Sequence, residues 1–384
     1  MYRVVFILML LTACVETFEF SRNNPDPQLV IEAQISDLSY NESLQAPSDG
    51  RYFKVKLRFT RPVSEYLGER ITPFAEVKII DDLDNEWMYY ENTNEWGTYI
   101  LPDKDFKACN DRMYKLQITT HDELISGGEQ VYESDWEKLP SLAPSPVEQI
   151  WFEEDERKIY FYPAERKQII DEKVVTVSTS IPVNSEGQLR HYKWEYSPMW
   201  VYEAPLATGE LLSPYKTCWI TNPLYLNEFA IEADVHGGQD KELFTLGIDG
   251  IVGNRRIFKR FSVLIFQQSV SKEYFNFCKL LKDQSTPSGI FETPPATAPT
   301  NFTCLSDPSK KPVGYFGVVN ESAKRWYFDK GDLSYYVDDY TLRECLIKYN
   351  RPQDPPDPAP ECLYCLACVD GDATLTKPSW WIDN

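Results

Sequence analysis

The chain has 384 residues, of which 39 are Lys or Arg and 59 are Asp or Glu, so its formal net charge at pH 7 is −20. This acidity excludes a protein that binds a nucleic-acid backbone through a basic surface, and it favours a soluble exterior. The length exceeds one ordinary domain of about 100 to 200 residues, so two hydrophobic cores are expected.

The N-terminal segment has the pattern of an export signal. One basic residue, Arg3, precedes an apolar run of eight residues at 4–11, and Cys14 follows Thr12 and Ala13. This run is too short for a membrane-spanning helix, which needs about 20 residues. The step Leu-Thr-Ala-Cys resembles the lipobox of bacterial lipoproteins, which implies removal of residues 1–13 and lipidation of Cys14. An ordinary signal peptide with a chance cysteine is the alternative, but it does not explain this step.

Residues 14–27 show no hydrophobic period and are expected to be a tether between the lipid anchor and the folded part. Glu16 and Glu19 resemble the acidic stretch that directs Bacteroidetes lipoproteins to the cell surface. Each buried methylene contributes about 0.8 kcal/mol, so two or more acyl chains hold a soluble protein stably on a bilayer. The sequence therefore predicts a protein that is anchored to a membrane without crossing it.

Residues 28–139 are predicted to form an immunoglobulin-like β-sandwich. Apolar and polar residues alternate over 54–59 and over 114–118, a period of two that indicates strands with one face on a core. About seven strands in this length are typical of such a sandwich. The other strands are expected at 29–35, 74–80, 87–91 and 97–101.

A linker at 140–146 (Pro-Ser-Leu-Ala-Pro-Ser-Pro) is expected to lead into a larger β-rich domain at 147–350. One amphipathic helix is predicted within 271–284, where an apolar stripe follows a capping Ser271. The fold class is therefore mainly β. Residues 351–384 form a Pro- and Cys-rich tail whose prolines favour an extended run. Strands of the larger domain are expected at 150–152, 159–162, 174–178, 192–196, 244–248 and 258–267.

Cysteine usage predicts disulfides rather than metal sites. Eight cysteines follow Cys14, an even number that allows up to four disulfides in an exported protein. The last three have a spacing that also suits zinc, but no nearby histidine supplies a fourth ligand. The acidic turn 81–86 lacks the glycine and the distal glutamate of a calcium loop, so a solvated hairpin is favoured there. The disulfide candidates are Cys109, Cys218, Cys278, Cys304, Cys345, Cys362, Cys365 and Cys368.

No motif in the sequence predicts an active site, and no cofactor is expected. The three histidines lie far apart, and Gly-x-Ser-x-Gly, His-Glu-x-x-His and phosphate-binding Gly-rich loops are absent. A carboxylate pair for glycoside hydrolysis stays open, because 59 acidic residues allow many pairings in a fold. Trp380 and Trp381 are the candidate binding residues, since neighbours on an extended chain point to opposite sides. One of them is expected to face outward unless the tail is buried.

Short segments along nearly the whole chain match one family. They include Cys-Val-Glu-Thr-Phe-Glu at 14–19, Leu-Val-Ile-Glu-Ala-Gln-Ile-Ser-Asp at 29–37, Val-Lys-Ile-Ile-Asp-Asp at 77–82 and Pro-Val-Gly-Tyr-Phe at 312–316. The family that they resemble consists of Bacteroidetes outer-membrane lipoproteins of unknown function, commonly encoded beside TonB-dependent receptors. The resemblance implies a location and a partner, but no catalytic or ligand-binding residues.

We therefore expect a lipoprotein of the outer membrane, exposed at the cell surface, that is a binding or accessory subunit of a TonB-dependent transporter. The resemblance implies a TonB-dependent receptor as the partner and a lipid anchor as the contact with the membrane. An enzyme is not expected. The alternatives are a secreted hydrolase that acts on glycans or peptides, and a structural lipoprotein of the envelope.

Overall fold

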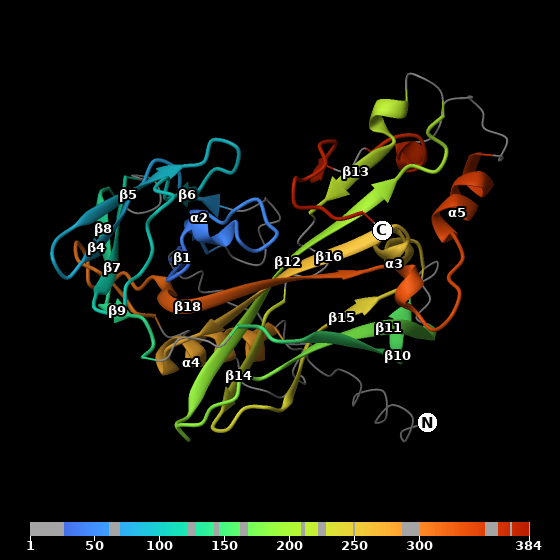
Figure 1. The fold of residues 1–384 in the computed structure, drawn as a ribbon. Coiled ribbons are helices and arrows are strands. Elements are labelled where there is room, and N and C mark those ends of the chain that lie inside the picture. Colours follow the sequence, from blue (N-terminus) through green and yellow to red (C-terminus); the bar gives the residue numbers. More distant parts are fainter. Residues whose placement is uncertain are drawn as a thin grey trace, which may run out of the picture.

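The computed structural model describes residues 27–60, 70–121, 128–141, 146–161, 168–208, 212–221, 228–248, 250–285, 300–349, 360–368 and 371–383. Cys14 and the predicted tether up to residue 26 lie outside these residues, as do residues 142–145 of the predicted linker. The described chain is mainly β, as predicted, and Figure 1 shows two lobes joined by long strands.

The strands of the first lobe are short, and those of the second are longer. In chain order the strands are β1 (Leu29–Ser36), β2 (Lys54–Phe59), β3 (Arg70–Ile71), β4 (Glu76–Asp81), β5 (Glu86–Glu91), β6 (Thr98–Ile100), β7 (Met113–Thr120), β8 (Gln130–Ser134), β9 (Glu137–Lys138), β10 (Ile150–Phe161), β11 (Gln168–Ser180), β12 (Arg190–Glu203), β13 (Thr217–Ile220), β14 (Ala230–Asp234), β15 (Asp240–Gly247), β16 (Arg260–Ser269), β17 (Phe302–Cys304), β18 (Val313–Phe328) and β19 (Ala373–Thr374). The helices are α2 (Tyr40–Ser43), α3 (Gly250–Ile257), α4 (Lys272–Ser285) and α5 (Tyr340–Tyr349), with short 3-10 helices η3 (Ser213–Tyr215), η5 (Lys330–Asp332) and η6 (Pro360–Cys365).

The first lobe is a β-sandwich whose strands follow the order β17-β8-β7-β4-β5-β6-β2-β1-β18. Every second side chain of a strand points into the core of this sandwich, as Val55, Leu57 and Phe59 of β2 do. The same core includes Phe302 of β17 and Phe316 of β18. Two strands from beyond residue 300 therefore complete a sandwich whose other strands lie within the predicted range 28–139.

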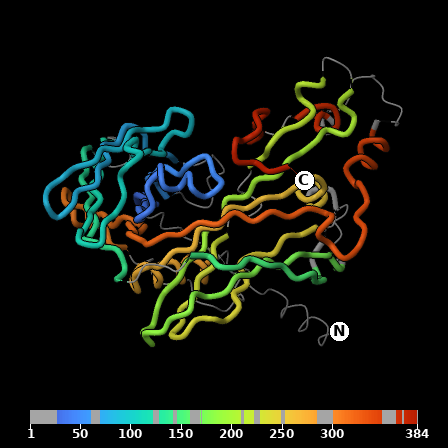
Figure 2. Tube along the Cα trace, in the orientation of Figure 1, coloured from blue at the N-terminus to red at the C-terminus, as the bar shows by residue number. Residues whose placement is uncertain are grey.

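Strand β18 joins the two lobes, and its path is visible in Figures 1 and 2. Its first part runs parallel to β1, and its second part runs antiparallel to β16. Gly314 pairs with Ile31 and has a φ of +132°, a conformation that other residues rarely adopt. A Cβ atom at this position would lie 2.0 Å from the carbonyl oxygen of Ile31, so the approach of the two strands requires glycine here.

The second lobe packs two sheets around a separate core. One sheet continues the order β18-β16-β12-β13-β19, and the other is the three-stranded sheet β10-β11-β15. Trp194, Trp200 and Phe261 from the first sheet meet Val177 and Leu246 from the second. Trp194 is therefore a core residue.

Most of the predicted elements are present. The period-two stretches at 54–59 and 114–118 form β2 and β7, and every other predicted strand overlaps an observed one. The strands predicted at 150–152 and 159–162 are parts of one strand, β10. Helix α4 confirms the predicted helix, and the Ser271 hydroxyl accepts a hydrogen bond from the Tyr274 N–H at 3.1 Å. Helices α3 and α5 were not predicted.

The acidic turn 81–86 is a hairpin between β4 and β5, as favoured from the sequence. Asp81 is 2% exposed, and its carboxylate accepts hydrogen bonds from the N–H groups of Leu83 and Asn85 and from the Asn85 side chain. Burial raises the pKa of Asp81, but these hydrogen bonds together outweigh it, so the pKa lies below its usual value.

Asp81→Ala should lower the free energy of unfolding by about 2 kcal/mol at pH 7, because several donors of the turn then lack an acceptor. A depressed pKa in the folded state means that this contribution is present above the unfolded pKa and is lost as the pH falls through the folded value. The gap between the two proteins should therefore close below about pH 4 in urea titrations from pH 7 to pH 2. Asp82→Ala is the control, since the Asp82 side chain pairs with Arg112 at 3.6 Å on the outside of the turn and its carboxylate is 29% exposed. An equal loss in both variants would contradict the prediction.

Candidate functional site

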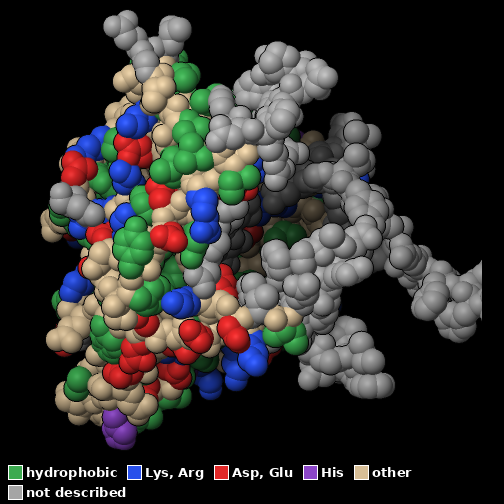
Figure 3. Space-filling model, turned by 90° about the vertical axis from the view of Figure 1, so that its right-hand side faces the viewer, with side chains coloured by type: hydrophobic (Ala, Val, Ile, Leu, Met, Phe, Trp, Pro, Cys, Tyr) green, Lys and Arg blue, Asp and Glu red, His purple; other side chains and the backbone are tan. Residues whose placement is uncertain are grey.

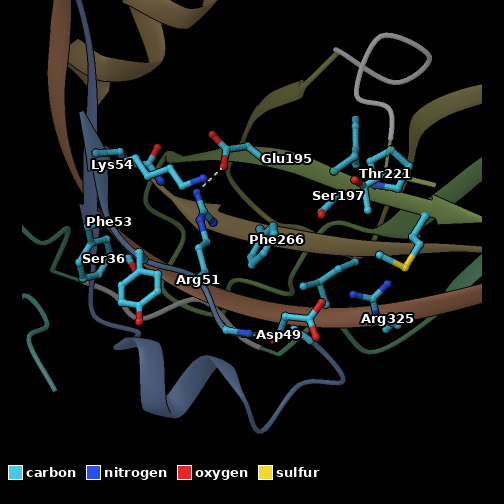
Figure 4. Close-up of a pocket in the computed structure, with 18 of the residues that line it drawn as sticks. Ser36, Asp49, Arg51, Phe53, Lys54, Glu195, Ser197, Thr221, Phe266 and Arg325 are labelled. Carbon is cyan, nitrogen blue, oxygen red and sulfur yellow. Dashed lines mark hydrogen bonds and ion pairs between the residues drawn. The ribbon is translucent and has the colours of Figure 1, made fainter. Parts of the chain in front are cut away.

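A cleft with a volume of about 530 Å³ lies between the two lobes. Figure 4 shows its floor on the strands of the second lobe, with the segment that leads into β2 as the opposite wall. The lining residues from the first lobe are Gln34, Ser36, Ser48, Asp49, Gly50, Arg51, Tyr52, Phe53, Lys54 and Lys56. Those from the second lobe and the tail are Glu195, Tyr196, Ser197, Pro198, Met199, Thr221, Leu264, Phe266, Arg325 and Trp380.

Strand alternation positions the floor of the cleft. On β12, Trp194 and Trp200 point into the core, so the side chains of Glu195, Ser197 and Met199 lie on the other face and line the cleft. On β16 and β18, Leu264, Phe266 and Arg325 line the cleft in the same way, while Val263, Ile265 and Trp326 pack in or against the core. One face of the sheet is therefore a core surface, and the other carries the polar groups of the cleft.

Arg51 connects the two lobes across the inner end of the cleft. Its guanidinium donates to Glu195 through Nη2 and to Glu321 through Nη1, both at 2.8 Å, and it lies 4.2 Å from the ring centroid of Phe266. Gln268 donates to Glu321 at 2.7 Å, so the buried Glu321 carboxylate, 2% exposed, has two partners. The contacts of Arg51 hold the wall of the cleft at a defined position over its floor.

Lys193 extends this network beneath the floor. Its Nζ lies 2.6 Å from Glu195 and 3.0 Å from the hydroxyl of Tyr274 on α4. Burial opposes the charged forms of Lys193 and Glu195, yet the attraction between them prevails. The pKa of Lys193 is well above its usual value, and Lys193 and Arg51 lower the pKa of Glu195 to about 2. For Glu321, burial has the larger effect and raises the pKa.

A second arginine lies at the other end of the cleft. Arg325 donates through Nε to the carbonyl oxygen of Pro47 and through Nη1 to the hydroxyl of Ser262 at 2.9 Å. Its guanidinium lies 3.6 Å from the ring centroid of Trp380. Burial lowers the pKa of Arg325 to about 10, so the side chain stays protonated at neutral pH while its charge is poorly solvated.

The two candidate binding residues have different environments. Trp381 is 5% exposed and packs with Met199 and Trp219, so it is not available to a ligand, because the end of the tail lies against the sheet. Trp380 is half-buried and lines the cleft. One of the two neighbours is therefore the more exposed, as expected from an extended chain, and a binding role stays a prediction for Trp380.

Four of the eight candidate cysteines form disulfides, Cys218 with Cys368 and Cys345 with Cys365. Both bonds tie the tail to the second lobe. They also rule out zinc at the last three cysteines, because the Cys365 and Cys368 sulfurs are already bonded. Of Cys362, only the backbone is described.

The disulfides predicted for Cys109, Cys278 and Cys304 do not form. Cys278 belongs to the apolar stripe of α4, and Cys304 packs in the core of the sandwich, so each serves as a small apolar side chain. Cys109 is exposed and unpaired. These three cysteines therefore remain free thiols.

The charged residues of the cleft were missed from the sequence. Lys193 and Glu195 alternate with aromatic residues in β12, and this was the one available signal that the outer face of this strand is polar. Arg51 and Arg325 carry no comparable signal, because their partners lie far away in the chain. Among the described residues, no group of three His, Cys, Asp or Glu side chains is arranged to hold a metal ion.

Comparison with known proteins bears on family membership alone. Within the described part of the chain, no helix is long and apolar enough to cross a membrane. A search of the curated proteins finds no match. The model of the DUF4249 family, described as a domain of unknown function, matches residues 15–325, which include both lobes and the cleft up to Arg325. The chain therefore belongs to the DUF4249 family.

Proposed function

We propose that this protein is a lipid-anchored binding subunit at the surface of a bacterial outer membrane, where it serves a TonB-dependent transporter. The cleft between the lobes is the ligand site. The observation that carries this proposal is the way the cleft is built: its charged side chains are held in place by partners from both lobes. Polar groups that are held in place within a cleft are typical of ligand-binding sites.

The protonation states in the cleft favour binding over hydrolysis. A glycoside hydrolase needs one carboxyl group with a raised pKa that can give a proton to the leaving group. Glu195 lines the cleft, but its pKa of about 2 keeps it ionised. Glu321 has a raised pKa, but it is buried behind Arg51 and does not line the cleft.

The lipid anchor and the partner rest on the N-terminal segment and on the segments that resemble outer-membrane lipoproteins. Anchoring at Cys14 would confine the protein to the membrane that holds the receptor. Confinement raises the effective concentration of the two proteins, so a modest interface between them is enough for a stable complex.

Affinity purification from detergent-solubilised outer membranes tests this proposal. Tagged wild-type protein should be labelled by a fatty-acid analogue and should recover a TonB-dependent receptor. Cys14→Ser should lose the label and most of the receptor, whereas Cys109→Ser, which removes an exposed unpaired thiol, should keep both. A labelled Cys14→Ser protein would contradict the anchor, and recovery of wild type without any such receptor would contradict the partnership.

A further inference from the structure

The cleft has a charge balance opposite to that of the whole chain. Its lining includes four basic side chains and two acidic ones, Asp49 and Glu195, whereas the chain has 39 basic and 59 acidic residues. On the face seen in Figure 3, basic and acidic side chains are interspersed. A cationic cleft in an acidic protein attracts a ligand of negative charge.

Two of the four basic side chains are already neutralised. Arg51 is paired with Glu195 and Glu321, and Lys56 lies 3.1 Å from Glu95. Among the described residues, Lys54 and Arg325 take part in no ion pair of the cleft. Asp49 attracts Arg325 only at longer range. The two positive charges of Lys54 and Arg325 and the negative charge of Asp49 together leave the cleft with one excess positive charge.

Arg325 is the better placed of these two cations. Neutral oxygens of Pro47 and Ser262 and the face of Trp380 fix its guanidinium, and none of them compensates its charge. A guanidinium has five N–H donors, and two of its nitrogens are used here, so the third, Nη2, remains for a ligand in the cleft. The Nη2 group can donate to one oxygen of a carboxylate. The charge of Arg325 is partly buried and not compensated by an ion pair of the cleft, which favours the binding of an anion.

We propose that the cleft binds a small ligand with one carboxylate, which pairs with Arg325 beside the indole of Trp380. A single excess charge fits a monoanion better than the double charge of a phosphate. The hydroxyl groups of Ser197 and Thr221 lie along the same cleft and suit further polar groups of the ligand. A volume of about 530 Å³ accommodates a sugar acid of two or three units or a short peptide with a free C-terminus.

Titration calorimetry of the full chain in detergent tests the proposal. The probes are a disaccharide with one uronate, a tripeptide with a free C-terminus, the neutral disaccharide, the amidated tripeptide and inorganic phosphate. One of the two carboxylate probes should bind at least tenfold more tightly than its neutral counterpart and than phosphate, and it should bind more weakly as salt is raised. Which carboxylate probe binds identifies the source of the ligand.

Arg325→Gln should weaken the binding of that probe at least tenfold. Arg325→Lys should restore only part of it, because lysine keeps the charge but lacks the guanidinium nitrogens that Pro47 and Ser262 hold in place. Arg157→Gln is the matched control, since Arg157 pairs with Glu242 outside the cleft. Circular dichroism of each variant verifies the fold. Absence of binding by both carboxylate probes, equal binding of phosphate, or an unchanged affinity of folded Arg325→Gln would overturn the proposal.

The carboxylate site rests on the proposed binding function, but the experiments can contradict the ligand class and the receptor partnership independently. A protein that recovers the receptor and binds no carboxylate probe contradicts the ligand class alone. A protein that binds a probe through Arg325 without recovering a receptor contradicts the partnership alone.

Discussion

Arg51→Met should lower the free energy of unfolding by about 3 to 5 kcal/mol at pH 7, because Glu321 would then keep a buried charge without its partner. The Glu321 side chain is 2% exposed, and after the substitution only the amide of Gln268 would contact it. Urea denaturation of the two proteins measures the loss. Arg58→Met is the control, since its partner Glu32 is 59% exposed, and it should cost less than about 1 kcal/mol.

The loss in Arg51→Met should depend on pH. Burial raises the pKa of Glu321 in the folded protein, and removal of Arg51 raises it further. A carboxyl with a raised folded pKa stabilises the protein below its unfolded pKa, and this contribution disappears as the pH rises through the folded value. The gap to wild type should therefore narrow toward pH 4, and Glu321→Gln in the same chain should recover most of the loss at pH 7. A loss that stays constant with pH would show that Arg51 acts through packing alone.

Removal of the disulfide between Cys218 and Cys368 should cost up to about 5 kcal/mol, because it closes a loop with a sequence separation of 150 residues. The bond between Cys345 and Cys365 spans 20 residues and should cost about 3 kcal/mol at most. Double alanine variants of each pair, compared by urea denaturation, measure both values. Cys109→Ala should change nothing, since that thiol is exposed and unpaired.

The longer disulfide also holds the tail on the second lobe. The tail carries Trp380 into the cleft, and its other attachments include the second disulfide, the short pairing of β19 with β13 and the packing of Trp381. Limited proteolysis of the Cys218→Ala, Cys368→Ala variant should cut within residues 371–383 under conditions that leave wild type intact. Equal protection in the two proteins would mean that packing alone fixes the tail.

The spacing of apolar residues along the chain predicted those strands and helices that pack against a single core. Strand β2 and helix α4 were found because their apolar side chains repeat at the period of the element and meet a single apolar surface. Strand β18 was missed because it crosses from one lobe to the other, and its second part carries Arg325 on the face that lines the cleft. A strand that passes between two environments has no single period to detect.

The sequence by itself determined the mainly β class, the helix at 271–284 and a cysteine usage compatible with disulfides, because these depend on residue types and on spacing along the chain. Only the tertiary structure decided which cysteines pair, that Trp381 is buried, and that Arg51 meets Glu321 across 270 residues of chain. The cleft, too, was decided only by the tertiary structure. It exists because β18 brings two separate cores together, and the contacts between distant residues that result leave no trace in local periodicity.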